Sequence, residues 1–238
     1  MSITKNLLNH LLKKEPLLKK LKKLFDFLFD LLIVFPYHKI FKNFVVFKFR
    51  GESYQYFLSP YNFTWEHERI VEVPIILKLV KDNQGKKILE IGNVLPHYAS
   101  FNHEVVDKYE KGRNVINQDI VDFNPQYKYD LIISISTFEH IGFDESPKDP
   151  TRVLAAFRNV TNILAPGGKA VITLPLGYNP ELDKILNGGK VSFVEQYYMK
   201  RVSRLNSWIE VNRDAVSNPR FNKPYRLANW LLIGVISI

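Results

Sequence analysis

The chain of 238 residues lacks several features that would point to particular classes of protein. It has no cysteine, which excludes disulfides and thiolate metal sites and is compatible with a reducing compartment such as the cytoplasm. Its six histidines include no pair at H-x-x-x-H spacing, so we expect no metal-dependent mechanism. Its most apolar stretch is interrupted by Asp26 and Asp30 and is shorter than the roughly 20 residues that span a bilayer.

The excess of positive charge belongs to one end of the chain. Residues 1–50 hold eleven basic and three acidic residues, a local charge of +8, whereas the remaining 22 basic and 21 acidic residues nearly cancel. A nucleic-acid enzyme more often spreads Lys and Arg over the face that holds its substrate. The charge therefore describes an N-terminal arm, and nucleic acid is not an expected partner.

Residues 1–43 form this basic helical arm, ahead of a predicted domain at 44–238. A stripe of apolar residues at helical spacing opposes a group of lysines: Leu17, Leu18, Leu21, Leu24, Phe25, Leu28, Leu32 and Phe35 against Lys19, Lys20, Lys22 and Lys23. Pro36 is expected to end the helix, and no secretory cleavage site follows. We expect residues 1–36 to lie on an anionic membrane surface; packing on the chain's own domain or in a homo-oligomer are the alternatives.

Two further elements precede the main domain pattern. Phe44–Phe49 and Tyr54–Leu58 are β-rich runs that predict a hairpin. Thr64–Val73 is expected to be a helix capped by its first residue, and Pro74 is expected to kink or restart it. The polar residues of this helix, Arg69 among them, form either solvated ion pairs or a lid over a ligand.

From residue 87 onward, strand patterns alternate with helices or loops. The predicted strands are Lys87–Ile91, His103–Asp107, Asn114–Asn117, Tyr129–Ile135, Lys169–Leu174, Val191–Tyr198, Ser207–Val211 and Trp230–Ile236, and the predicted helix is Thr151–Leu164. Such alternation predicts an α/β fold of the Rossmann-like, doubly wound kind. Its sheet is mainly parallel, and its ligand crevice lies at the carboxyl ends of the strands.

Short motifs follow these strands in a recognisable order. They are Glu90-x-Gly92, Asp107, Asp119-Ile120, the run from Tyr129 to His140, and Leu164-Ala-Pro-Gly-Gly-Lys169. Together they resemble a class I S-adenosylmethionine (SAM)-dependent methyltransferase, over about residues 87–175. The resemblance implies a seven-stranded sheet with an antiparallel last strand. It also implies an N-terminal helix, placed from Thr64, that caps the cofactor pocket.

The resemblance further implies where SAM would bind. The cofactor needs a turn beside its methionine part, a carboxylate for the ribose diol and a polar group near the adenine. The predicted cofactor-binding residues are Glu90, Gly92, Asn93, Asp107, Lys108, Asp119, Ile120, Ser136 and Thr137. In the alternative interpretation, Glu90 and Asp107 only cap strands and bind solvent.

Two departures from the family pattern separate SAM from a dinucleotide. Val94, Leu95 and Pro96 stand where a G-x-G-x-x-G motif would continue, and a pyrophosphate needs those glycines and a helix N-terminus. An NAD-dependent oxidoreductase is therefore disfavoured. The crossovers at 92–102 and 108–113 are also short for full helices, so the cofactor half is abbreviated.

These patterns predict a SAM-dependent methyltransferase acting on an oxygen of a small molecule or glycan. His140 is the expected general base and Glu139 its orienting partner; alternatively, the pair only shapes its loop and substrate positioning supplies the rate. Tyr178 and Asn179 are expected to hold the acceptor, and Arg69 to meet an anionic one. The alternative function is a methyltransferase-fold protein without activity that serves in binding or scaffolding.

Overall fold

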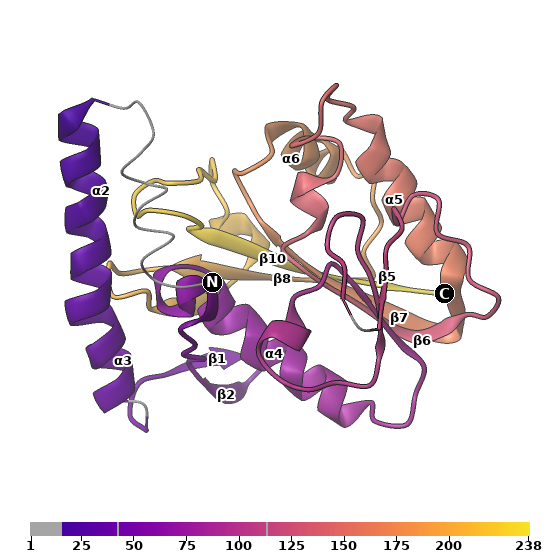
Figure 1. The fold of residues 1–238 in the computed structure, drawn as a ribbon, viewed down its shortest axis with the longest axis horizontal. Helices are drawn as coiled ribbons and strands as arrows, with labels where there is room; N and C mark the ends of the chain where they lie inside the picture. The colour runs from indigo at the N-terminus through magenta and orange to yellow at the C-terminus, as the bar shows by residue number, and fades with distance from the viewer. Residues whose placement is uncertain (1–15, 42, 113) are drawn as a thin grey trace.

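A central sheet of eight strands organises the chain, for which a computed structural model describes residues 16–41, 43–112 and 114–238 (Figure 1). In spatial order the strands are β5 (Val115–Ile116), β4 (Glu104–Val106), β3 (Ile88–Ile91), β6 (Tyr129–Ile135), β7 (Leu164–Pro175), β10 (Trp230–Ser237), β8 (Glu195–Arg201) and β9 (Trp208–Val211).

The direction of the strands confirms the predicted Rossmann-like sheet. Strands β5, β4, β3, β6 and β7 pair in parallel, while β10 pairs antiparallel with both β7 and β8. The sheet has eight strands and not seven, because β9 adds to the edge of β8 in the register Tyr198↔Val211. Trp208 of β9 is buried, so hydrophobic burial favours this extra pairing.

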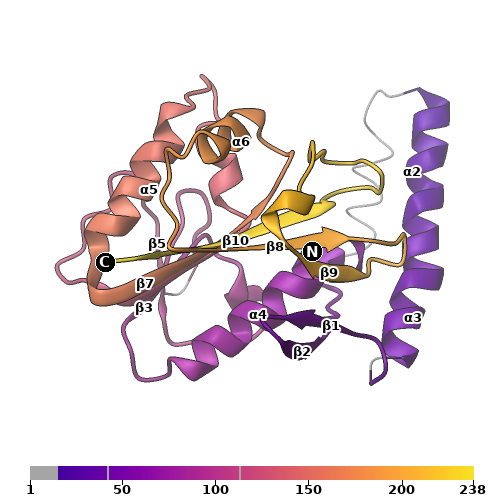
Figure 2. The same ribbon diagram turned by 180° about the vertical axis from the view of Figure 1, so that it is seen from behind.

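One face of the sheet is covered by two helices from the second half of the chain. Ile132 and Ile172 point to this face and share a hydrophobic cluster with α5 (Thr151–Ile163) and α6 (Pro180–Asn187). The predicted helix Thr151–Leu164 is thus confirmed to within one residue. Figure 2 shows α5 and α6 together on one side of the sheet.

The opposite face is covered by the predicted hairpin and by one long helix. Ile133 and Val171 point to this second cluster, which also contains residues of β1 (Val46–Phe49) and of α4 (Arg69–Asp82). Strand β1 pairs antiparallel with β2 (Glu52–Gln55), as the sequence predicts. Alternate side chains of each buried strand therefore serve two different cores.

The helix expected from Thr64 begins later than predicted and is not broken at Pro74. Thr64 lies in a 3₁₀ turn, where its hydroxyl donates to the Phe57 carbonyl and accepts the Ser59 amide, so it caps no helix. Pro74 lies inside α4 without ending it. Because Pro74 has no amide to donate to the Ile70 carbonyl, that carbonyl instead accepts the amide of Phe57 at 3.0 Å.

The N-terminal arm also continues past its expected end. Its described part consists of α2 (Leu17–Phe29), a π-helical turn (Asp30–Val34) and α3 (Phe35–Ile40), so the prediction that Pro36 ends the helix is wrong. Residues 1–15 of the predicted arm lie outside the described residues. The wider π turn, in which the Phe35 amide bonds to the Asp30 carbonyl, accommodates the proline at the start of α3. Among the described residues, no helix is long and apolar enough to span a bilayer.

The two crossovers beside the cofactor motif are short, as expected. The connection from β3 to β4 contains only a 3₁₀ turn at Leu95–His97, and the described residues between β4 and β5 contain no helix. Both connections therefore return from the carboxyl end of one strand to the start of the next without an α-helix in their described residues. This leaves the ends of β3 and β4 accessible to a ligand.

Candidate cofactor-binding and active site

A cavity of about 390 Å³ opens at the carboxyl ends of β3, β4 and β6. Every predicted cofactor residue except Glu90 contributes to its wall: Gly92, Asn93, Asp107, Lys108, Asp119, Ile120, Ser136 and Thr137. The fold thus brings together residues that are up to 45 positions apart in the chain. A cavity of this size lies in the range of small-molecule sites.

The first loop at this edge depends on Gly92. Its φ of +87° is in the left-handed region, and a Cβ placed on it would lie 2.3 Å from the Thr137 hydroxyl oxygen. A glycine is therefore required for the β3 and β6 loops to approach each other here. Glu90 lies beneath this loop and outside the cavity wall, where it accepts the amides of Val94 and Leu95 and contacts His103 at 2.7 Å.

Asp107 anchors the second loop. One carboxylate oxygen accepts the Asn93 amide at 3.0 Å, and the other accepts the amides of Tyr109 and Glu110 at 2.8 and 2.7 Å. The oxygen bonded to Asn93 has one further lone pair, so it can still accept a hydroxyl. Asp107 therefore shapes its loop and also presents an acceptor to the cavity.

Asp119 is held by two cations and one amide. Its carboxylate accepts the Val121 amide, lies 3.0 Å from the Lys108 ammonium and 2.5 Å from the Arg152 guanidinium. Burial would raise its pKa, but these hydrogen bonds outweigh burial and hold the pKa below its ordinary value. Asp119 is thus an ionised, positioned carboxylate in the wall.

The cavity carries an excess of negative charge. Five carboxylates line it and two cations oppose them: Asp107, Glu110, Asp119, Asp144 and Glu145 against Arg69 and Lys108. Such a wall favours a cationic ligand and disfavours phosphate groups.

His140 is held in a defined orientation at the mouth of this cavity. Its Nδ1 lies 2.5 Å from a carboxylate oxygen of Asp144, which also accepts the Tyr178 hydroxyl at 2.8 Å. Burial would raise the Asp144 pKa, but the hydrogen bonds from His140 and Tyr178 lower it. Nε2 of His140 lies 3.6 Å from a carboxyl oxygen of Glu139.

Glu139 is placed behind this histidine and outside the cavity wall. It is 2% exposed, and burial raises its pKa well above the ordinary value. A carboxyl group in this environment is stabilised in its neutral form.

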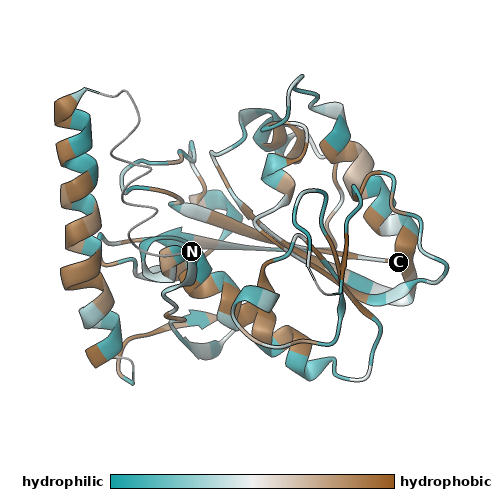
Figure 3. Ribbon diagram, viewed as in Figure 1, coloured by the Kyte–Doolittle hydropathy of each residue, from teal (hydrophilic) through white to brown (hydrophobic). Residues whose placement is uncertain are grey.

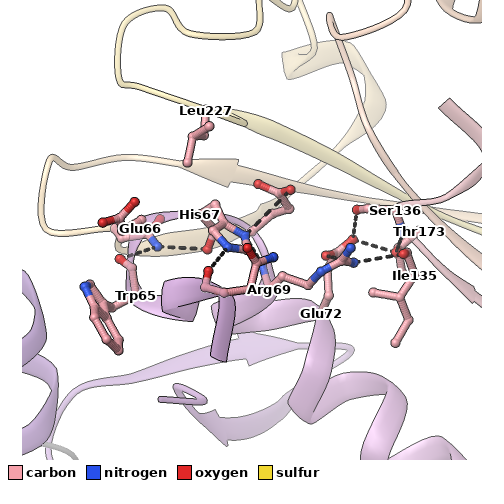
Figure 4. A network of polar contacts seen from close by, with 12 residues as sticks. Trp65, Glu66, His67, Arg69, Glu72, Ile135, Ser136, Thr173 and Leu227 are labelled. Atoms are coloured by element: carbon pink, nitrogen blue, oxygen red, sulfur yellow. Dashed lines mark hydrogen bonds and ion pairs between the residues drawn. The ribbon is translucent and has the colours of Figure 1, made fainter. Parts of the chain in front are cut away.

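Arg69 belongs to a buried network and does not lie on a lid. Its guanidinium donates to the Ile135 carbonyl at 2.8 Å and to Glu72 at 3.3 Å (Figure 4). The other Glu72 oxygen accepts the hydroxyls of Ser136 and Thr173 at 2.5 and 2.6 Å. The network fixes α4 to the ends of β6 and β7, with Arg69 as part of the cavity wall.

The two residues predicted to hold the acceptor differ in their surroundings. Asn179 is buried, and its side-chain oxygen accepts the amides of Glu181 and Leu182 at the start of α6. Its amide donates to the Glu139 carbonyl, so the side chain of Asn179 is engaged in structure. The ring of Tyr178 instead contacts His140, with the ring centres 5.0 Å apart.

Asp144 is not among the residues predicted from the sequence, although its carboxylate holds His140, the candidate base. A weak signal existed, because the two residues are four apart in His140-Ile-Gly-Phe-Asp144, a spacing that places side chains together in a helical turn. The acids Glu110 and Glu145 were also missed. They lie in loops, and no local pattern indicates that these loops meet at one cavity.

Comparison with known proteins gives matches in structure alone. No protein-family model and no curated protein sequence matches the chain. Solved structures that resemble it include the N-methyltransferase NodS from Bradyrhizobium japonicum WM9 in complex with S-adenosyl-L-homocysteine, at 16% identity and a TM-score of 0.42, covering 68% of this chain and 82% of that one.

Two further structures resemble the chain at similar levels. The methyltransferase CcbJ from Streptomyces caelestis has 11% identity and a TM-score of 0.40, covering 68% of this chain and 87% of that one. A SAM-dependent methyltransferase from Clostridium acetobutylicum has 15% identity and a TM-score of 0.34, with coverages of 68% and 89%.

Proposed function

We propose that the chain is a SAM-dependent methyltransferase that methylates an oxygen of a small-molecule or glycan acceptor. The observation that carries this proposal is the acid-rich cavity at the carboxyl ends of β3, β4 and β6. SAM bears a sulfonium and an ammonium group against a single carboxylate, and no phosphate, so its net positive charge matches a wall of five carboxylates and two cations. A dinucleotide would place its pyrophosphate against the same carboxylates.

Individual residues of the cavity suit parts of this cofactor. The turn at Gly92 and Asn93 lines the cavity and would lie beside the methionine part, and the free lone pair of Asp107 can accept a ribose hydroxyl. Asp119 and Ile120 belong to the same wall and would meet the adenine. When bound, SAM supplies an electrophilic methyl group.

His140 would then act on the acceptor. With Nδ1 held by Asp144, Nε2 would take the proton of an acceptor hydroxyl as the hydroxyl oxygen bonds to the methyl carbon. The bond between that carbon and the SAM sulfur would break at the same time, and S-adenosylhomocysteine would leave. Asp144 stabilises the imidazolium that forms, and Tyr178 orients Asp144 through its hydroxyl. Glu139, buried behind the ring, supports its position.

One observation favours the alternative of a binding or scaffolding protein without activity. Both oxygens of Asp107 accept backbone amides, and Asp119 is paired with two cations, so each carboxylate already has a structural role. In that case SAM binds weakly or not at all, and no methyl group is transferred.

The first test is the Asp107→Ala variant. Loss of a charge-assisted hydrogen bond to the ribose should weaken SAM binding by about 1.5 to 3 kcal/mol, as measured by calorimetry. Asp122→Ala removes the same charge from an exposed position outside the cavity and should leave the affinity unchanged. Equal affinities of Asp107→Ala and wild type would remove Asp107 from the site, and a wild type that binds neither SAM nor its demethylated product contradicts the function.

The second test concerns His140 and uses an acceptor found by screening glycans and hydroxylated metabolites with labelled SAM. His140→Gln should lower turnover by at least about 10²-fold, the lower end of general-base effects, with SAM affinity unchanged. Near-normal turnover of this variant from about pH 6 to 9, where an imidazole loses its proton, would exclude His140 as the base.

A further inference from the structure

A second cavity, of about 670 Å³, lies between α6, β8 and the segment that follows β9. Three basic side chains line it, Arg213, Arg220 and Lys223, against one acid, Asp183, whose carboxylate already accepts the Gly177 amide. Within the described part of the chain, none of the three cations has an ion-pair partner. This cavity has the opposite charge to the acid-rich one.

The rest of its wall is largely apolar. The apolar residues come from the turn after β7, from the loop before β8 and from β10: Leu176, Val191, Phe193 and Leu232. An apolar wall with a cluster of guanidinium and ammonium groups suits a compact organic body that carries an anionic group.

The two cavities are separated by one aromatic side chain. The Tyr178 ring lies 5.0 Å from the His140 ring, at the acid-rich cavity, and 5.0 Å from the Phe221 ring, at the basic cavity. Its hydroxyl is held by Asp144 alone among the described residues. Tyr178 therefore joins the wall of the basic cavity to the candidate base.

We infer that the basic cavity binds the acceptor, and that the acceptor carries a phosphate or carboxylate group held by Arg213, Arg220 and Lys223. The identification of the ligand as the methyl acceptor rests on the proposed methyl transfer, whereas the anion site does not depend on it. The acceptor hydroxyl reaches His140 past the edge of the Tyr178 ring, while the Tyr178 hydroxyl stays bonded to Asp144. Specificity for an anionic acceptor thus comes from the C-terminal loops, while cofactor binding comes from the first half of the sheet.

The test measures anion binding without SAM. Inorganic pyrophosphate and glucuronate serve as the phosphate and carboxylate probes, titrated calorimetrically against the full chain. At least one should bind, and Arg213→Gln combined with Arg220→Gln should weaken that binding at least tenfold while SAM affinity is unchanged. Arg158→Gln combined with Lys128→Gln, both exposed and outside the cavity, makes the same change in net charge.

Two results overturn the inference: neither probe binds to the wild type, or both double variants weaken binding equally. The second result would show that the net charge of the protein, and not the cavity, attracts the anion. If the chain does not bind SAM but still binds an anion, and the cavity variants weaken that anion binding, only the proposed methyl transfer is contradicted.

An independent observation concerns the outer face of the arm. The inner face is docked: Val34 is buried, Asp26 and Asp30 pair with Arg204 and Arg226, and the His38 ring bonds to the Leu205 carbonyl. Other apolar side chains of α2, the π turn and α3 point outward, with Leu18 82%, Leu32 63% and Ile40 70% exposed. Figure 3 shows apolar and polar residues alternating along α2 and α3 at one edge of the molecule.

The charges on the arm identify the kind of partner. Asp26 and Asp30 are the only acids of the described arm, and both are used in pairs with the domain. A second copy of the chain would offer an arm of the same basic character, whereas anionic lipid offers the opposite charge together with an apolar interior. We propose that this face lies on an anionic bilayer surface, with the outward Leu, Ile and Phe side chains entering the interface.

Vesicle co-sedimentation of the full chain tests this second proposal. Phosphatidylglycerol vesicles should bind the wild type, and Leu18→Asp combined with Leu32→Asp should reduce binding at least tenfold. Val194→Asp combined with Tyr109→Asp, two exposed apolar positions on the domain, is the matched control and should bind as wild type. Two results would contradict the proposed lipid contact. Both double variants could bind vesicles equally, or light scattering could show a dimer that only the arm variant loses.

Discussion

At the scale of single residues, burial and hydrogen bonding act on carboxylates in opposite directions. Asp144 receives hydrogen bonds from His140 and Tyr178, which lower its pKa despite burial. Asp183 receives one amide hydrogen bond, from Gly177, and burial dominates and raises its pKa to about 6. Asp183 is thus a carboxylate whose ionisation opposes folding.

This shift predicts a pH-dependent gain in stability from Asp183→Asn. Because the folded-state pKa is raised, the contribution of Asp183 to stability is present below the unfolded value of about 3.8 and is lost as the pH rises through about 6. The variant keeps an oxygen for the Gly177 amide but cannot ionise. At about pH 8 the free energy of unfolding of the variant should exceed that of wild type by about 1 to 2 kcal/mol. At about pH 4 the difference should disappear.

Urea unfolding at both pH values measures this difference. Asp122→Asn is the control at an exposed position and should change stability at neither pH. A gain for Asp183→Asn that is equal at both pH values would assign the effect to packing and not to ionisation.

At the scale of elements, the loop after β3 depends on a close approach that only glycine allows. Gly92→Ala should lose SAM affinity at least tenfold, because the added methyl group displaces Thr137 in the cavity wall. It should also lower stability by about 1 to 2 kcal/mol through its left-handed φ. Gly167→Ala shares a positive φ of +73° but meets nothing within 4 Å, so it should lower stability alone.

Calorimetric titration of both variants with SAM separates the two effects. SAM affinity that falls equally in the two variants would attribute the loss to instability. Unchanged affinity in Gly92→Ala would place the cofactor away from this loop.

At the scale of the whole molecule, Glu72 joins the N-terminal half of the chain to the sheet. It comes from α4 and bonds to Ser136 after β6 and Thr173 in β7, beside the Arg69 guanidinium (Figure 4). Glu72→Ala would leave a buried cation without its carboxylate partner. We expect it to cost about 3 to 5 kcal/mol of unfolding free energy.

Asp82→Ala, in the same helix, provides the comparison. It removes an exposed pair with Lys78 and should cost at most about 1 kcal/mol. Chemical denaturation of both variants measures the difference, and equal losses would show that the buried network does not hold α4 to the sheet.

Local patterns in the sequence predict α5 to within one residue and the strands to within a few residues; β8, for example, begins at Glu195 and not at Val191. The excess of positive charge in residues 1–50 is likewise a property of the sequence alone. These features follow from local signals: two-residue alternation, continuous apolar runs such as Tyr129–Ile135, and the positions of the charges. The motif residues Gly92, Asp107 and Asp119 were also placed correctly at one cavity, because the carboxyl ends of parallel strands share one edge.

The pairing of buried polar groups depends on the three-dimensional arrangement of the chain. The Ile70 carbonyl left free by Pro74 is paired by Phe57, and Asn179, expected at the acceptor, instead caps α6. The basic cavity and its separation from His140 by Tyr178 likewise depend on loops that are distant in the chain. Partners for buried polar groups are chosen by spatial proximity, which local patterns do not encode, so a helix can pass a proline wherever another segment supplies the missing hydrogen bond.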